Sequence, residues 1–290
     1  MTITAKILAD SVHRRVGRTR RLTTFELRYP RFIHAEMLTP RLFSRNSASS
    51  RAIPIERVIR DVLEDPADFV FWGKNQPGMQ AAVELGPAAI AECRAAWLDA
   101  RTNAVFTARQ MLAQGAHKQN VNRLLEPWSH ITVVLSATDF ANFYHLRRDA
   151  AAQPEMRALA NAMFDAHHLS VPVDRTNLQG IDEWHLPFVT DEERREWSFN
   201  VIMIAVGRAA RVSYLTHNGK RDPAADIELA QRLERSGHWS PFEHVARPYA
   251  PSWLRRMFGR TDQCGNFAGW QQQRKMMRDE HPYTEGQIFP

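Results

Sequence analysis

The strongest limit on how this chain can fold comes from residues 23–29, T-T-F-E-L-R-Y, in which polar and apolar side chains alternate. Alternation with a period of two is typical of a β-strand that has one buried face. A strand needs a neighbour to pair its backbone groups, and the apolar segment at residues 6–9 can supply one. We therefore expect a β-hairpin near the start of the sequence.

Most of the remaining chain has patterns typical of helices. Pro30 suits the first turn of a short helix that ends before Pro40. Residues 131–135 are apolar and β-branched, and they predict either a strand or the buried start of a helix. A helix capped by Thr138 should then end at Arg147. Longer helices are expected at residues 55–63, 87–114, 118–125, 154–167, 191–212 and 224–236.

Composition favours a soluble protein with anionic partners. The net charge of +6 and the pI near 9.7 suit nucleotides, phosphate-bearing cofactors or nucleic acid, without choosing among them. No apolar run approaches the roughly 18 residues that a membrane-spanning helix needs. The first ten residues lack the features of a secretory signal, so we expect a cytoplasmic protein.

Neither a disulfide nor a metal site is predicted. Cys93 and Cys264 are far apart and form no paired spacing. No Cys, Asp or Glu lies at metal-ligand spacing from the histidines His167, His168, His185 and His217.

Basic residues crowd the segment at residues 13–21, which resembles a hairpin tip around Gly17. A solvated turn is the more common explanation of such a cluster, and RNA or DNA binding is the alternative. Proteins that bind single strands interleave aromatic residues with the basic ones, and this segment has none. We therefore regard nucleic-acid binding as the least favoured interpretation.

The loop at residues 41–54 carries the clearest chemical signal. Three arginines and several hydroxyl or amide side chains share residues 41–51, directly after a predicted helix. The planar guanidinium of arginine pairs with two phosphate oxygens at once, and serine hydroxyls can fill the remaining acceptors. The loop therefore suits a nucleotide monophosphate or a cofactor pyrophosphate, although a solvated Ser-rich turn would have a similar composition.

Residues 39–52 resemble the signature R-H-R-x-x-S-x-N-E-x-S-x-R-Y of flavin-dependent thymidylate synthases. The chain departs from this signature at Thr39, Pro40, Ser47 and Ala52. The matching positions are Arg41, Ser44, Asn46, Ser49 and Arg51.

Two further blocks follow in the order of that family. Residues 118–127 resemble the family's helix whose arginine, here Arg123, reaches the nucleotide phosphate. Residues 139–153 resemble the segment N-F-x-x-L-R-x-x-x-x-A-Q, which places Asn142 near the flavin and Arg147 against the pyrimidine ring.

The last block resembles the beginning of the family although it lies late in this chain. Residues 210–214, A-R-V-S-Y, and residues 237–244, G-H-W-S-P-F-E-H, match segments that precede the arginine motif in the family. A circular permutation preserves contacts when the original termini lie close together. We predict one permuted domain, with the nucleotide-binding part at residues 23–156, a helical insert at 157–205 and the family's opening part at 206–290.

The resemblance implies a site and assigns roles within it. Arg147 and His238 are the implied catalytic residues. The implied nucleotide-binding residues are Glu36, Ser49, Ser50, Arg51, Arg123 and Arg147. The implied flavin-binding residues are Arg41, Ser44, Asn46, Asn142, Ser213, His238 and Ser240. We add Arg274, with Lys275, as a hypothetical source of the positive charge that is missing at Thr39 and Pro40.

The resemblance also implies a fold and a reaction. The fold is α/β of the α+β kind, with a small antiparallel sheet packed against long helices and an extra helical insert. The reaction is methylation of deoxyuridylate (dUMP) at C5, with FAD as cofactor and methylenetetrahydrofolate and NADPH as co-substrates, in a homotetramer. This route needs no catalytic thiol, and neither cysteine lies in a nucleophile motif.

Two alternatives remain open within the same resemblance. The chain could be a flavin enzyme that hydroxymethylates a deoxypyrimidine nucleotide. It could also be a nucleotide-binding paralogue without turnover, since four signature positions differ.

Overall fold

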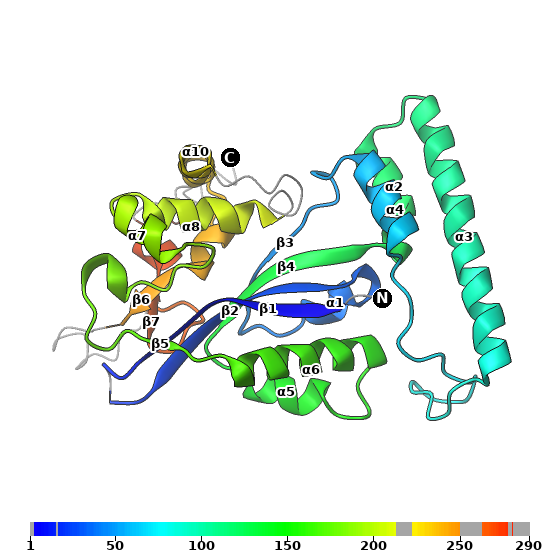
Figure 1. Ribbon diagram of the computed structural model, residues 1–290, viewed down its shortest axis with the longest axis horizontal. Coiled ribbons are helices and arrows are strands. Elements are labelled where there is room, and N and C mark those ends of the chain that lie inside the picture. Colours follow the sequence, from blue (N-terminus) through cyan, green and yellow to red (C-terminus); the bar gives the residue numbers. More distant parts are fainter. Residues whose placement is uncertain (1–2, 16, 213–221, 250–262, 278–279, 281–290) are drawn as a thin grey trace, which may run out of the picture.

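The computed structural model describes residues 3–15, 17–212, 222–249, 263–277 and 280, and a five-stranded sheet lies at its centre (Figure 1). The strand order is β3-β4-β2-β1-β5, and every neighbouring pair is antiparallel except β1 with β5. The strands are β1 (Thr4–His13), β2 (Arg20–Pro30), β3 (Ser44–Ser47), β4 (His130–Ala137) and β5 (Val173–Asp174). Helices pack around this small sheet, so the predicted α+β fold is confirmed.

The predicted hairpin is formed by β1 and β2. Phe25, Leu27 and Tyr29 are buried, whereas Glu26 and Arg28 between them are only partly buried. Both strands are longer than the side-chain pattern indicated, because backbone pairing continues along the whole hairpin whatever the polarity of the side chains. The expected short helix after β2 is present as η1 (Arg31–Ile33) and α1 (His34–Met37).

The apolar face of the sheet is covered by α5 (Ala141–Arg147) and α6 (Pro154–Leu169), which lie below it in Figure 1. Met156, Leu159 and Met163 of α6 join apolar side chains of β2 and β4 in the largest buried cluster. Residues 131–135 belong to β4, so the strand interpretation of that segment is the correct one.

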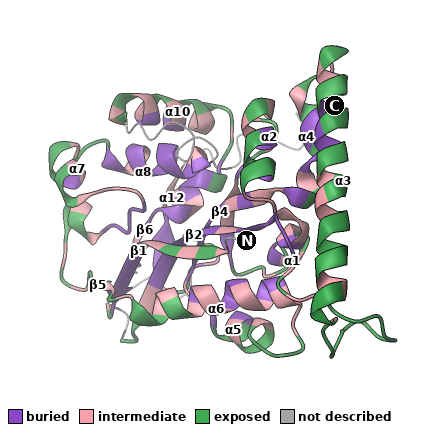
Figure 2. Cartoon of the chain, turned by 45° about the vertical axis from the view of Figure 1, so that its right-hand side comes forward, coloured by how far each residue is buried: buried purple, intermediate pink, exposed green. Residues whose placement is uncertain are grey.

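A helical arm stands beside the sheet, at the right of Figure 1. It has its own apolar core, which includes Val58, Ile59 and Trp128, and most of its longest helix is exposed (Figure 2). The arm consists of α2 (Ile55–Glu64), α3 (Pro87–Ala113), α4 (Lys118–Leu124) and η2 (Glu126–Trp128). In the described part of the chain, no helix is long and apolar enough to cross a membrane.

A third group of elements covers the other face of the sheet near the start of β3. It contains η3 (Gly180–Glu183), α7 (Asp191–Glu196), α8 (Val201–Ala210), α10 (Pro223–Arg235), η4 (Ser240–His244), β6 (Ala246–Pro248), β7 (Trp270–Gln272) and α12 (Gln273–Met276). The predicted insert at residues 157–205 is not purely helical, because β5 within it joins the central sheet.

The single helix expected at residues 191–212 is wrong, because the chain turns between α7 and α8. The turn lets Glu193 of α7 reach Arg208 of α8, whose side chain is completely buried. Arg208 makes ion pairs with Glu193 at 2.6 Å and with Asp226 at 2.9 Å. Next to it, Gly207 allows α8 to approach α10 so closely that a Cβ would overlap the Asp226 carbonyl oxygen.

Candidate functional site

A pocket of about 250 Å³ lies between the start of the arginine-rich loop and helix α5. We call it the Arg147 pocket. Thr39, Pro40 and Arg41 line one side of it, and Asn142 and Arg147 line the other. Residues from two sequence blocks that are about a hundred positions apart therefore meet at one place.

Helix α5 presents the residues of this pocket because of its periodicity. Asn142, Phe143, Leu146 and Arg147 have the spacing that puts side chains on one helical face. The helix is fixed at its start by Asp139, whose carboxylate accepts a hydrogen bond of 2.9 Å from the Ala141 backbone N–H.

The predicted cap of this helix, Thr138, has another role. Its hydroxyl accepts a hydrogen bond from the backbone N–H of Ala268 at 2.9 Å. Thr138 therefore holds the C-terminal segment against the sheet, and the first backbone N–H of α5 bonds to the Asp139 carboxylate instead.

Phe43 anchors the loop side of the pocket. It is buried, and its ring lies 5.2 Å from Phe143 and 5.3 Å from Phe140, measured between ring centroids. Because these three aromatic residues pack together, the part of the loop that carries Arg41 lies next to α5.

Arg147 connects the pocket with a larger groove. Its guanidinium lies 3.7 Å from the Glu36 carboxylate, and both side chains remain partly exposed. Glu36 also lines an adjoining groove of about 1090 Å³, together with the segment at residues 149–155 and the loop around Phe69 and Phe71. The Arg147–Glu36 pair thus lies where the pocket and the groove meet.

The other predicted nucleotide-binding residues lie apart from this pocket, between β3 and α4. Ser49 and Arg51 are exposed, and the Ser50 backbone carbonyl accepts a hydrogen bond of 2.6 Å from Asn122. Arg123 is exposed on α4 and pairs with Glu126 at 2.8 Å. Within one chain, the predicted nucleotide-binding residues therefore form two separate groups, one at the Arg147 pocket and one near α4.

Ser44 and Asn46 of β3 are engaged with late parts of the chain. The buried Ser44 hydroxyl accepts a hydrogen bond from Gln272 and donates one to Asn266, both at 3.2 Å. The Asn46 amide donates to the backbone carbonyl of Ala209 at 3.2 Å. These contacts hold parts of residues 206–290 against the arginine motif.

The residues predicted from the permuted block lie on the surface or outside the described residues. His238 is exposed and is hydrogen-bonded to Ser236 at 2.9 Å, and Ser240 is exposed at the start of η4. Ser213 lies outside the described residues. The roles of all three stay predictions.

Arg274 and Lys275 are both ion-paired on α12. Arg274 pairs with Glu243 and, at 2.9 Å, with Glu280, and Lys275 pairs with Glu280 at 2.5 Å. Because two carboxylates already face these cations, their positive charge is largely neutralised where they stand.

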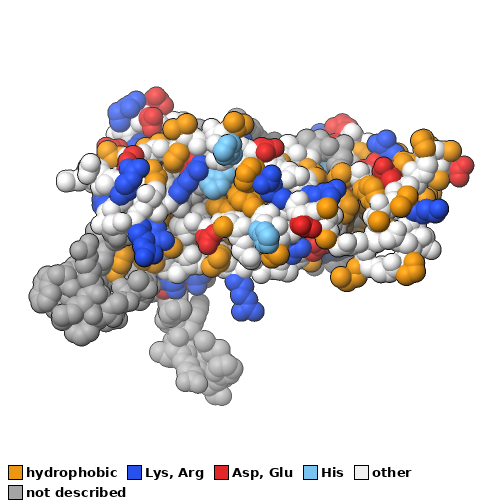
Figure 3. All heavy atoms as spheres, turned by 90° about the horizontal axis from the view of Figure 1, so that it is seen from below, with side chains coloured by type: hydrophobic (Ala, Val, Ile, Leu, Met, Phe, Trp, Pro, Cys, Tyr) orange, Lys and Arg blue, Asp and Glu red, His pale blue; other side chains and the backbone are white. Residues whose placement is uncertain are grey.

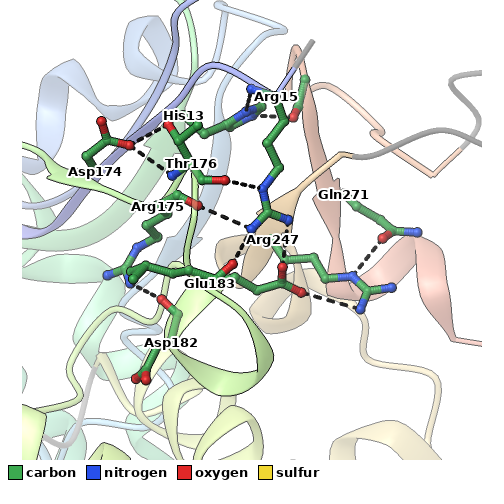
Figure 4. Close-up of polar contacts among 11 residues, drawn as sticks. His13, Arg15, Asp174, Arg175, Thr176, Asp182, Glu183, Arg247 and Gln271 are labelled. Carbon is green, nitrogen blue, oxygen red and sulfur yellow. Dashed lines mark hydrogen bonds and ion pairs between the residues drawn. The ribbon is translucent and has the colours of Figure 1, made fainter.

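The basic segment at residues 13–21 differs from the expected solvated turn. Arg21 pairs with Asp10, and Figure 4 shows Arg15 and Arg247 pointing toward Glu183. The Arg15 guanidinium lies 2.7 Å from Glu183 and also donates to the Thr176 carbonyl at 2.8 Å. Arg15 therefore ties the hairpin tip to the segment after β5.

Surface charge gives no further support for a nucleic-acid interface on the face drawn in Figure 3. There the Lys and Arg side chains are interspersed with acidic and apolar ones.

Sequence reasoning missed a buried chain of hydrogen bonds across the sheet, which we call the histidine chain. Thr24 on β2 is hydrogen-bonded to Ser136 at 2.6 Å and to His185 at 2.7 Å. Ser136 continues to His244 at 2.8 Å, and His185 to Ser11 at 2.9 Å. Burial lowers the pKa of His244 to about 3 and that of His185 well below its ordinary value, so both rings are neutral. The only hint of this chain in the sequence was the polar Thr24 within the alternating strand.

Comparison with known families supports the resemblance found in the sequence. The sequence model of the thymidylate synthase complementing protein family matches residues 7–173, which is more than half of the chain. The chain therefore belongs to the thymidylate synthase complementing protein family. The match runs from β1 to β5 and contains the arginine-rich loop, α4 and α5.

Two solved structures are similar to parts of the chain, and both are of the UMP/dUMP methylase PolB from Streptomyces cacaoi. The complex with 5-Br dUMP is 19% identical, with a TM-score of 0.41, over 51% of this chain and 66% of that chain. The complex with 5-Br UMP is 18% identical, with a TM-score of 0.45, over 57% of this chain and 88% of that chain. None of the curated proteins compared matches the sequence.

The family match ends before residues 206–245, so the rotated order of the blocks stays a prediction. Val212 belongs to the largest core cluster, and η4 lies against β3.

Proposed function

We propose that this chain is an FAD-dependent enzyme that methylates dUMP at C5, with methylenetetrahydrofolate as one-carbon donor and NADPH as reductant. Membership of the family supports this proposal. The observation that carries it is the Arg147 pocket, where Arg41, Asn142 and Arg147 meet beside Glu36. We include a cytoplasmic location in the proposal.

Two unpaired side chains in this pocket fit a flavin. Arg41 and Asn142 are exposed and make no ion pair or side-chain hydrogen bond with any residue that the structure describes. A guanidinium suits a pyrophosphate, and an amide can both donate to and accept from the polar edge of a flavin ring. Ser44 and Asn46 fit this role less well, because their side chains are already bonded within the chain.

The proposed nucleotide site uses Arg147 and Glu36 for the pyrimidine ring. Positive charge held at Arg147 would stabilise negative charge that develops on the ring during one-carbon transfer. The bound flavin, when reduced, supplies the reducing equivalents, and the chain contributes placement and electrostatics. The carboxylate of Glu36 fixes the guanidinium of Arg147 from one side and leaves its other donors open.

A homotetramer is part of the same proposal. Ser49, Ser50, Arg51 and Arg123 lie near α4, away from Arg147, so a single chain presents an incomplete phosphate and base site. Assembly of several chains could bring the α4 group of one chain to the Arg147 pocket of another. Light scattering of the purified protein tests the assembly.

One observation favours a second candidate, a nucleotide-binding paralogue without turnover. Thr39 and Pro40 line the Arg147 pocket where the family signature has Arg and His, so the pocket offers fewer groups to a cofactor. Under this alternative the protein would bind dUMP but take up no FAD.

The visible spectrum of purified protein with added FAD distinguishes the two. The enzyme proposal expects bound flavin whose spectrum changes when dUMP is added, followed by formation of dTMP. Replacing Arg147 by Met should weaken the dUMP response about 10- to 100-fold, because a charged hydrogen bond is lost. Arg148→Met is the matched control, since Arg148 lies over the Phe164 ring instead. A colourless protein that still binds dUMP would establish the paralogue, and equal loss in both variants would contradict the role of Arg147.

A further inference from the structure

The Glu36 carboxylate and the Arg147 guanidinium lie close together without a hydrogen bond between them. Their separation of 3.7 Å is longer than a hydrogen bond, so neither group satisfies the other. Neither side chain makes a hydrogen bond with any residue that the structure describes. The Glu36 side chain is 41% exposed and the Arg147 side chain is 29% exposed, so both can reach a ligand.

Two hydrogen bonds fix the short helix that carries Glu36. The Thr39 hydroxyl donates to the Glu36 backbone carbonyl at 2.8 Å, and the Arg45 guanidinium donates to the Met37 carbonyl at 2.8 Å. Met37 is completely buried, which anchors α1 in the core. Thr39 is one of the positions at which the chain departs from the family signature, and here it supports the backbone of Glu36 instead of adding a second cation.

The surroundings of the Glu36 carboxylate are negative overall. Among the described residues, Arg147 is the only cation within ion-pair distance of it. Two further carboxylates, Asp149 and Glu155, and one cation, Arg157, line the adjoining groove. A ligand group that carries a negative charge would therefore be repelled on the Glu36 side of Arg147.

The pair matches a ligand edge on which a donor and an acceptor are neighbours, because a carboxylate only accepts and a guanidinium only donates. Uracil has such an edge, since its N3–H lies between two carbonyl groups. Neighbouring atoms of this edge are closer together than the 3.7 Å between the two side chains, so hydrogen bonds of ordinary length can reach both. When N3 loses its proton, the ring becomes an anion and N3 can only accept.

We propose that Glu36 selects pyrimidine nucleotides whose ring carries a proton on N3. Its carboxylate accepts the hydrogen bond from N3–H, and Arg147 donates to the neighbouring carbonyl oxygen. An ionised ring is rejected, because it has lost the donor and brings a second negative charge next to Glu36. Because Glu36 and Arg147 belong to the proposed dUMP site, this role of Glu36 rests on the proposed function and adds the form of the substrate that the site accepts.

The test uses 5-bromo-dUMP and the full chain purified with FAD. Bromine withdraws electrons from the ring, so N3–H ionises at a lower pH than it does in dUMP. Calorimetry gives the Kd at neutral pH and at an alkaline pH above the pKa of the bromouracil ring. For the original chain, we expect binding to weaken about tenfold or more between the two, since a charged hydrogen bond is replaced by a repulsion.

Glu36→Gln separates the hydrogen bond from the general effect of charge. The amide can accept from N3–H and, after rotation, donate to an ionised N3, so this variant should bind 5-bromo-dUMP about equally at both pH values. Asp149→Asn is the matched control, because it removes an exposed carboxylate of the same groove that bonds to the Ala151 backbone N–H. It should keep the tenfold loss. Equal pH dependence in the original chain and in Glu36→Gln would overturn the proposal.

A measurement on the unaltered chain covers the case in which Glu36→Gln does not fold. With dUMP labelled with nitrogen-15 at N3, proton NMR of the complex at neutral pH should show the N3–H resonance, because the hydrogen bond to Glu36 protects this proton from exchange with water. Absence of that resonance would overturn the proposal.

The outcomes also separate this role of Glu36 from the proposed enzyme function. Failure of both dUMP and 5-bromo-dUMP to bind at any pH would overturn the two together. Binding of 5-bromo-dUMP that does not depend on pH would overturn the role of Glu36 alone, and the flavin spectrum and formation of dTMP would be unaffected by that result.

Discussion

Strand β4 lies between two buried histidines that differ in their surroundings. His130 at the start of the strand lines a pocket of about 230 Å³ between the sheet and the arm, whereas His244 near the other end is completely buried and lines neither that pocket nor the two cavities described above. Both rings are neutral, and each has an Nε2 without a partner among the described residues. Each unpaired nitrogen is closed off from solvent, so the two residues differ in whether a pocket lies beside the residue and not in access to the nitrogen.

The difference arises from what covers each end of the strand. Near Ser136, the sheet is covered by η4 and by a small apolar cluster that contains Leu22, Phe267 and Trp270, so the polar side chains bond to one another. At His130 the neighbouring α2 and α4 belong to the arm, which has a separate core and leaves a gap beside the strand. Substitutions at the closed end, near Ser136, should therefore change the free energy of unfolding most. Substitutions at the open end, near His130, should change it little.

The largest expected effect is loss of stability in acid through the closed end. His244 has a folded pKa of about 3 against about 6.5 when unfolded, so below pH 6.5 the unfolded chain binds a proton that the folded chain does not. Stability is complete above pH 6.5 and falls by about 1.4 kcal/mol per pH unit for each such histidine as the pH drops toward 3. Urea unfolding at several pH values measures this slope.

His244→Gln should reduce that slope by one proton, whereas His168→Gln, at an exposed site, should leave it unchanged. An unchanged slope in His244→Gln would show that the closed end is not what makes the protein sensitive to acid.

A smaller effect should follow from breaking the histidine chain at Thr24. Thr24→Val removes a hydroxyl that bonds to both Ser136 and His185, and it leaves two buried groups short of a partner. We expect unfolding to become easier by about 1–3 kcal/mol. Thr132→Val on the same sheet face is the matched control at the open end, with an expected change within about 0.5 kcal/mol. Equal costs in the two variants would remove the distinction between the ends.

The smallest effect should come from the ion pair at the open end. Arg28 and Asp65 lie 2.8 Å apart, but their side chains are 30% and 37% exposed, so solvent screens the pair. Asp65→Asn should cost no more than about 1 kcal/mol in urea unfolding. A loss of several kcal/mol would mean that this end is covered in solution, for example by another copy of the chain.

Local sequence patterns correctly predicted the strands and helices whose formation depends mainly on neighbouring residues. The alternation at residues 23–29 gave the hairpin, and the helical periods gave α2, α3, α4, α6 and α10 within a few residues. The motif blocks identified the family, because a spacing such as that of Asn142 and Arg147 is a property of the sequence itself. The predicted site residues are placed by the structure, and their roles await the experiments above.

Only the tertiary structure decided what depends on contacts between distant residues. The break between α7 and α8 lets Glu193 pair with the buried Arg208, a contact between residues 15 positions apart. The hydrogen bond of Thr24 to His185 joins residues 161 positions apart, and no local periodicity of the sequence predicts such a pair. The pockets likewise exist because separate segments pack together. The sequence by itself determined the strands, helices and family, since backbone propensity and motif spacing are local, whereas long-range packing determined which side chains are closed off and which remain open to a ligand.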